Sequence, residues 1–208
     1  MTSNIYEVRS AVKKIAWGFF LLHMSVHLGP VDILPDWAGY ALIVSALAFV
    51  VCLEEDLKRL RTVGIALLVW NVISWIGNIF GFSAYLSYVG IIPAIGSMYF
   101  FYKLFCELAD LSDKYSCRQG SSLRFWGVAN ATLSVVTTAV VYLSLLFSIE
   151  DILIVVSATT LALSLFAMLG SMITLFSFAG ALKDVPDNNF PENYIADDVN
   201  HFGDGSVL

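Results

Sequence analysis

The distribution of the basic residues is the feature that most constrains how this chain folds. All eleven Lys and Arg residues fall on one side once the apolar runs are drawn as six membrane-spanning helices. They are Arg9, Lys13, Lys14, Lys58, Arg59, Arg61, Lys103, Lys114, Arg118, Arg124 and Lys183. The three opposite connections contain neither Lys nor Arg. Because short cytoplasmic loops carry the excess of basic residues in membrane proteins, this pattern predicts that the N-terminus and the C-terminus are both cytoplasmic.

The composition also indicates a membrane protein. Hydrophobic residues make up 58% of the 208 residues and charged residues 13%, with a mean hydropathy of +0.78. Soluble domains contain about 25% charged residues. We therefore expect an all-α, polytopic membrane helix bundle in the plasma membrane, in contact with the lipid bilayer. The predicted spans cover residues 15–28, 37–53, 63–82, 85–105, 125–147 and 152–182, within one transmembrane domain over residues 1–183.

The chain after the last span is acidic. Residues 184–208 contain six acids and no Lys or Arg, and their apolar residues are scattered. Such a segment cannot bury a core of its own. We expect residues 184–208 to form a disordered cytoplasmic tail.

Two histidines provide the strongest candidate site in the sequence. His23 and His27 are four residues apart in the first predicted span, so on a helix they would share one face. Two imidazoles one turn apart can chelate a transition metal, with Asp32, Asp36 or Asn78 as further ligands from the outer end. Neutral histidines hydrogen-bonded across helices are the simpler alternative, and we favour it over metal binding. No cofactor is predicted.

Two further polar stripes have helical spacing. Asn71, Ser74 and Asn78 follow one face of the third span, and Asn130, Ser134 and Thr137 one face of the fifth. Such stripes can line a solute path, although they more often form hydrogen bonds between helices. No acidic or basic residue lies deep in any predicted span, which argues against an ion-driven pump. Catalytic and nucleotide-binding motifs are missing too, and the basic clusters are too small for nucleic acid.

One segment resembles a known group of proteins. Residues 32–40, Asp-Ile-Leu-Pro-Asp-Trp-Ala-Gly-Tyr, are similar to an Asp-Ile-Leu-Pro-Asp-aromatic-x-Gly-Tyr segment. That segment links the first two helices in a group of small multi-spanning membrane proteins of Gram-positive bacteria, to which no activity is assigned. The resemblance covers about a dozen residues and implies a bacterial plasma membrane location. Histidine is not expected in that group at the positions of His23 and His27, which weakens the metal hypothesis.

These observations leave three functional hypotheses. The first is a non-enzymatic protein that binds a small solute or a membrane partner from the outer face, near His23, His27, Asp32, Asp36 and Asn78. The outer connections carry only acids, so such a solute should be neutral or cationic. Six spans and about 200 residues also resemble, in size and topology, the substrate-binding subunits of vitamin uptake transporters. The second hypothesis is a structural or regulatory membrane subunit that acts through helix contacts, and the third is a metal-dependent membrane enzyme that uses His23 and His27.

Overall fold

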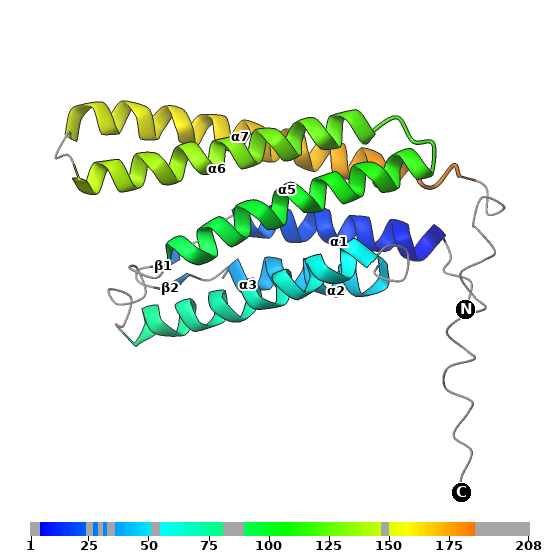
Figure 1. Cartoon of the computed structure of the whole chain (residues 1–208), viewed down its shortest axis with the longest axis horizontal. Helices are drawn as coiled ribbons and strands as arrows, with labels where there is room; N and C mark the ends of the chain where they lie inside the picture. Colours follow the sequence, from blue (N-terminus) through cyan, green and yellow to red (C-terminus); the bar gives the residue numbers. More distant parts are fainter. Residues whose placement is uncertain are drawn as a thin grey trace, which may run out of the picture.

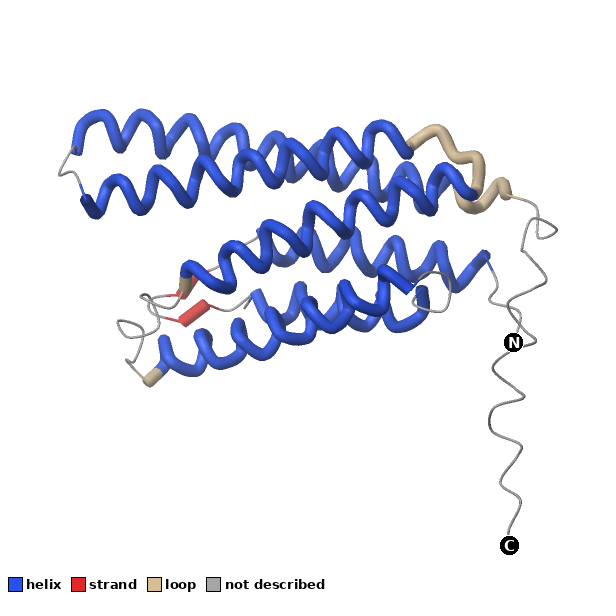
Figure 2. Tube along the Cα trace, in the orientation of Figure 1, coloured by secondary structure: helices blue, strands red, loops and turns tan. Residues whose placement is uncertain are grey.

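The computed structural model describes residues 5–23, 27–28, 31–32, 36–50, 55–80, 90–146 and 150–185. Within these ranges the chain forms six helices, one over each predicted apolar run, and one short strand pair (Figures 1 and 2). The helices are α1 (Ile5–His23), α2 (Asp36–Val50), α3 (Glu55–Ile79), α5 (Ile91–Lys114), α6 (Gly120–Leu146) and α7 (Glu150–Ala181). The strands are β1 (His27–Leu28) and β2 (Val31–Asp32). The predicted helical class is therefore confirmed, while the tail beyond residue 185 lies outside the described residues.

The six helices form a closed ring in chain order. Each of α1, α2, α3, α5 and α6 packs against the next helix, and α7 packs back against α1. Successive helices run in opposite directions, so the strand pair and the described chain start lie at opposite ends of the bundle (Figure 1). An Arg9 Nε donor bonds the Ala179 carbonyl oxygen at 3.1 Å and ties α1 to α7 at the N-terminal end. The ring is what allows side chains from distant parts of the sequence to face one centre.

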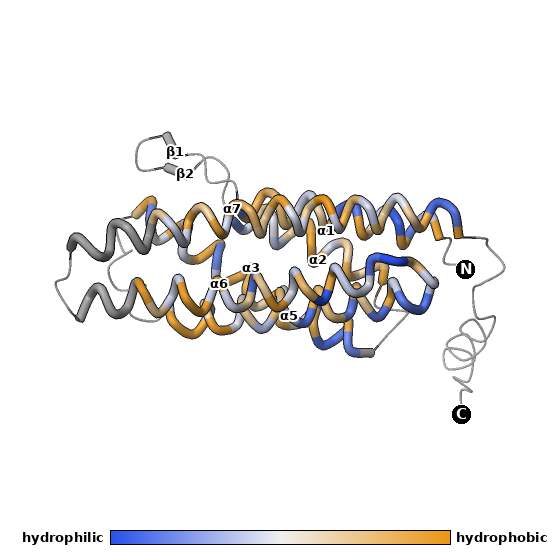
Figure 3. Tube along the Cα trace, turned by 90° about the horizontal axis from the view of Figure 1, so that it is seen from above, coloured by the Kyte–Doolittle hydropathy of each residue, from blue (hydrophilic) through white to orange (hydrophobic). Residues whose placement is uncertain are grey.

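The helices extend further toward the end that carries the basic residues than the apolar runs predict. α1 begins at Ile5 rather than near residue 15, α3 at Glu55 rather than 63, and α5 continues to Lys114 rather than ending at 105. Residues 106–124 lie between two predicted spans, but only residues 115–119 separate α5 from α6. Hydrophilic residues gather toward this end in Figure 3.

These extensions form because they bury one apolar face each. Their buried residues recur at helical spacing and join a single hydrophobic core: Val8, Ala11 and Val12; Leu57 and Leu60; Leu108 and Leu111; Leu123; Phe178 and Leu182. Most charged side chains of these extensions occupy the other faces, which is the amphipathic pattern of a helix in water. We infer that the bundle continues past the apolar region as a packed, water-facing end. We call this part the basic end.

Helices α1 and α2 approach each other most closely where two glycines meet. A Cβ at Gly39 would lie 2.7 Å from the Gly18 backbone oxygen and 2.5 Å from Leu22 Cγ. A Cβ at Gly18 would lie 2.7 Å from the Gly39 backbone oxygen. The missing side chains of Gly18 and Gly39 are therefore what permits this close packing. Small residues allow such contacts between membrane helices.

Two local predictions near the opposite end are wrong. α1 ends at His23 and His27 begins β1, so the two histidines do not share a helix face. The strands pair antiparallel, with His27 opposite Asp32 and Leu28 opposite Val31. In the sequence, prolines at positions 30 and 35 are incompatible with one continuous helix from α1 to α2. A proline inside the span predicted over residues 85–105 would kink that helix, but Pro93 lies in the first turn of α5, where its missing amide hydrogen costs nothing.

Three of the six helices are long and apolar enough to cross a membrane. The qualifying segments are Asp56–Ile79, Ile91–Lys114 and Ala158–Ala181. α2 is apolar but has only 15 residues, or about 22 Å at 1.5 Å per residue, against about 30 Å of hydrocarbon. α1 carries Glu7, Arg9, Lys13 and Lys14, which shorten its apolar part. The described residues thus support a membrane protein with three such helices, where the sequence predicted six spans.

The glycine contact between α1 and α2 makes a testable prediction. Gly39→Ala should lower stability by roughly 1–3 kcal/mol, because the new methyl group must displace backbone and Leu22. Gly180→Ala is the matched control, since a Cβ there meets nothing within 4 Å. The control should be neutral or stabilising by up to about 1 kcal/mol through helix propensity. Thermal unfolding of both purified variants measures the difference, and equal melting temperatures would contradict the packing.

Candidate functional site

The ring encloses an open cavity with two lobes at the end away from the basic residues. The first lobe has a volume of about 360 Å³ and the second about 300 Å³. The lobes share six lining residues: His23, Ala94, Ser97, Met98, Asn130 and Ser134. Together they take residues from all six helices. Small-molecule sites usually fall in this size range. We call these two lobes the central cavity.

Aromatic residues separate the central cavity from the basic end. Phe19 packs edge-on against Phe101 and Phe105, with ring centroids 5.7 and 5.5 Å apart. Phe100, which is fully buried, packs against Phe101 at 5.3 Å and against Tyr40 at 6.0 Å. These aromatic side chains fill the middle of the helix bundle with close-packed apolar groups. Phe19, Phe101 and Tyr40 also line the first lobe and form its floor.

The two lobes differ in chemistry. The first combines the aromatic floor with Trp70, Asn71 and the carboxylate of Asp36. The second is lined by hydroxyl groups, from Ser97, Ser134, Thr137, Thr138 and Ser164. Among the described residues, neither lobe is lined by a Lys, Arg or Glu side chain. A ligand would therefore meet neutral polar groups, one carboxylate and aromatic faces.

Hydrogen bonds to the helix backbone fix the polar lining side chains. His23 Nδ1 lies 2.9 Å from the Phe19 carbonyl oxygen, which only accepts, so Nδ1 carries the hydrogen and Nε2 remains an acceptor. Asn130 Nδ2 donates to the Trp126 carbonyl oxygen and to Ser171 Oγ, both at 2.7 Å. Asn71 Nδ2 donates to the Leu67 carbonyl oxygen at 2.8 Å. Each side chain is thus held in one orientation before any ligand arrives.

The structure brings together some of the predicted site residues and not others. His23 and Asp36 both line the central cavity. His27 and Asp32 are backbone partners across the strand pair, and their side chains lie outside the described part of the chain. Asn78 lies near the end of α3, is exposed, and does not line either lobe.

The polar stripes of the sequence contribute unequally to the cavity. All three residues of the α6 stripe, Asn130, Ser134 and Thr137, line it. On α3, Asn71 lines it and Ser74 does not. Sequence reasoning missed Ser97 and Trp70 as site residues. Ala94 and Ser97 are three residues apart in the sequence, but small residues at that spacing indicate only helix packing.

The metal hypothesis finds no support among the residues whose side chains are described. No three His, Cys, Asp or Glu side chains of that set gather closely enough to hold a metal ion. The helical basis for chelation by His23 and His27 is gone, because His27 is not on α1.

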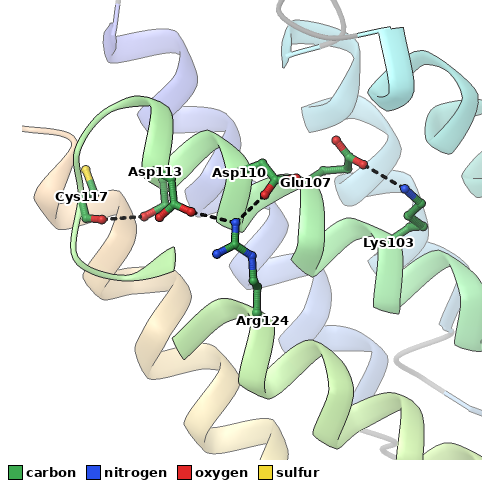
Figure 4. A network of polar contacts seen from close by, with 7 residues as sticks. Lys103, Glu107, Asp110, Asp113, Cys117 and Arg124 are labelled. Carbon is green, nitrogen blue, oxygen red and sulfur yellow. Dashed lines mark hydrogen bonds and ion pairs between the residues drawn. The ribbon is translucent and has the colours of Figure 1, made fainter. Parts of the chain in front are cut away.

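A second polar cluster lies at the basic end and joins α5 to α6 (Figure 4). Arg124 Nη2 contacts Asp110 Oδ1 at 2.6 Å and Asp113 Oδ2 at 2.7 Å. Lys103 and Glu107 form an ion pair one turn apart at 3.4 Å, in which Glu107 is buried. In the turn between the two helices, Ser116 has a positive φ of 54°. The backbone N–H of Cys117 donates a hydrogen bond to the Ser112 carbonyl oxygen at 2.8 Å and closes this turn.

This second cluster has a structural explanation. Arg124 uses one nitrogen to hold two carboxylates of the neighbouring helix, which fixes the angle at which α6 begins. Burial raises the pKa of the Cys117 thiol above its ordinary value, so the thiol stays protonated at neutral pH and is a poor nucleophile. The central cavity is therefore the better candidate for a functional site.

Comparison with known protein families, with curated proteins and with solved structures finds no match to this chain.

The bond between Asn130 and Ser171 makes a prediction about how the cavity wall is held. Ser171 is fully buried, and its hydroxyl joins α7 to the α6 side chain that faces both lobes. Ser171→Ala should lower stability by about 1 kcal/mol, the usual value of one such bond. Ser45→Ala is the control, because Ser45 is exposed and bonds only its own helix.

A double-mutant cycle isolates the contact. Asn130→Ala alone and together with Ser171→Ala should give a coupling energy of about 0.5–1 kcal/mol by thermal unfolding. A coupling energy of zero would show that the two side chains do not interact.

Proposed function

We propose that this protein is a six-span protein of a bacterial plasma membrane, with both termini in the cytoplasm and the central cavity open to the outside. The one-sided Lys and Arg residues support this orientation, because they lie toward the end opposite the cavity. In the proposed arrangement α1, α2 and α6 cross as well, their shorter apolar parts covered by the three longer helices. The segment over residues 32–40 supports the bacterial location through its resemblance to the Gram-positive group.

We propose further that the protein binds a small neutral or cationic solute in the central cavity and is not an enzyme. The observation that carries this proposal is the convergence of polar side chains from α1, α2, α3, α5 and α6 on one open space. Apolar side chains would fill such a space more favourably if only stability mattered, because unfilled volume in a core is costly. Polar side chains held in fixed orientations around open volume are typical of a binding site.

The charge of the lining supports the choice of solute. Asp36 brings one carboxylate to the first lobe, and neither lobe is lined by a described Lys or Arg. An anion would pay for desolvation without a partner in this cavity. A neutral solute would use the amide and hydroxyl groups, and a cation would also gain from Asp36.

Blocking the cavity tests this function. Ser134→Trp places a large side chain where both lobes meet, whereas Val135→Trp changes the next residue, which is 55% exposed and does not line the cavity. Purified wild-type protein in nanodiscs is screened by thermal shift against sugars, amino acids, vitamins and amines. A ligand at one hundred times its Kd should stabilise the wild type by about 2.7 kcal/mol.

The two variants give the screen its control. Val135→Trp should keep the stabilisation and Ser134→Trp should lose it. Stabilisation of Ser134→Trp equal to that of the wild type would place binding elsewhere. No stabilisation of the wild type by any compound at saturating concentration would contradict the proposed function.

A further inference from the structure

Four polar side chains of the central cavity donate their hydrogens to the protein itself: Ser97, Thr137, Asn130 and His23. Ser97 Oγ donates to the Ala94 carbonyl oxygen at 2.8 Å, and Thr137 Oγ1 donates to the Leu133 carbonyl oxygen at 2.8 Å. Both Nδ2 hydrogens of Asn130 are used, by Trp126 and Ser171. The Nδ1 hydrogen of His23 is used by Phe19. In each case the partner belongs to the same helix or to its neighbour in the ring.

What these side chains retain for a ligand is their lone pairs. A hydroxyl that donates to a carbonyl still accepts through its oxygen, an amide retains its Oδ1, and a neutral imidazole retains one bare nitrogen. The lining therefore offers acceptors at Thr137 Oγ1, Asn130 Oδ1 and His23 Nε2. Asp36 adds carboxylate oxygens, which only accept when ionised. These side chains therefore offer a ligand acceptors rather than donors.

The non-polar part of the lining has the same electrostatic preference. Phe19, Trp70 and Phe101 present aromatic rings to the first lobe, close to the Asp36 carboxylate on α2. The faces of aromatic rings attract cations. A cation with several N–H donors thus suits the acceptor atoms, the carboxylate and the aromatic faces. A neutral acceptor or an anion would instead place its own lone pairs against the lone pairs of the lining.

We propose that the ligand of the central cavity is a primary organic ammonium ion, whose N–H groups donate to the acceptor oxygens and nitrogen of the lining. This inference rests on the proposed function, because it names the class of solute bound at that site. The ammonium group carries three N–H donors for the acceptors of the lining, and its positive charge is attracted by the Asp36 carboxylate. The carbon body of the ligand lies against the aromatic floor.

Matched probes test the need for donors. Butylammonium and 2-phenylethylammonium are titrated into the full-length protein in nanodiscs by calorimetry. For each, the N-trimethyl derivative keeps the charge without N–H donors, the alcohol keeps a donor without charge, and the carboxylate reverses the charge. We expect at least one primary ammonium ion to bind about tenfold more tightly than its N-trimethyl and alcohol partners, and the carboxylates not to bind.

A pair of isosteric variants tests the acceptors. Thr137→Val removes an oxygen that lines the second lobe, and Thr132→Val removes one with the same bond to its own helix, at 2.9 Å, outside the cavity. Both residues are exposed on α6, so their effects on folding should be equal. Thr137→Val should weaken ammonium binding about three- to tenfold, and Thr132→Val should leave it unchanged.

The outcomes separate this inference from the proposed function. Equal affinity for the ammonium, N-trimethyl and alcohol probes, or binding by a carboxylate, would overturn the requirement for donors. Failure of both ammonium ions to bind would also overturn it, as would equal binding by the two Thr variants. The proposed function would still stand in those cases if another solute stabilised the protein and Ser134→Trp abolished the effect.

Discussion

The packing of Phe19 against Phe101 and Phe105 is the contact on which the rest of the structure depends. These aromatic side chains connect α1 and α5 across the helix bundle, and they fill its middle with apolar groups. Toward the basic end, Leu108 and Leu111 continue this core without a break. Toward the other end, the polar residues His23, Ser97 and Asn130 take the place of the aromatic rings, and the space between them stays open. The contacts among these aromatic side chains thus stabilise the basic end and also limit the depth of the central cavity at the opposite end.

The division between the two ends also explains how charges are distributed. Basic side chains find partners outside the apolar region, as Arg124 does with Asp110 and Asp113 and Arg9 does with the end of α7. Among the described residues, the polar groups that line the cavity are neutral apart from one carboxylate. The proposed orientation follows from that asymmetry, since it places the basic end in the cytoplasm. The same asymmetry gives the cavity its proposed preference for cations.

The sequence predicted the six helices of the described residues and the polar stripes, but not how far the helices extend or where the stripes meet. Charged residues such as Lys13 and Glu107 limit the apolar runs, although Val8, Val12, Leu108 and Leu111 show helical spacing beyond those limits. A spacing of four residues puts His23 and His27 on one face only if the helix includes both, and α1 ends at His23. The rotation of each helix about its axis depends on packing partners elsewhere in the chain, so the meeting of Asn71, Asn130 and His23 could not be derived from any one segment. Asn78 shares a stripe with Asn71, yet lies about two turns further along α3 and misses the cavity.

Accessibility of the cavity from the outer side is the most direct test of this account. In intact bacterial cells expressing a variant without native cysteines, Ser134→Cys should react with a membrane-impermeant thiol reagent added outside. Val135→Cys, which faces away from the cavity, should react at least about tenfold more slowly, because a thiol in lipid ionises poorly. Labelling of Ser134→Cys only after the cytoplasmic side is opened, or equal labelling of the two variants, would contradict an outward-opening central cavity.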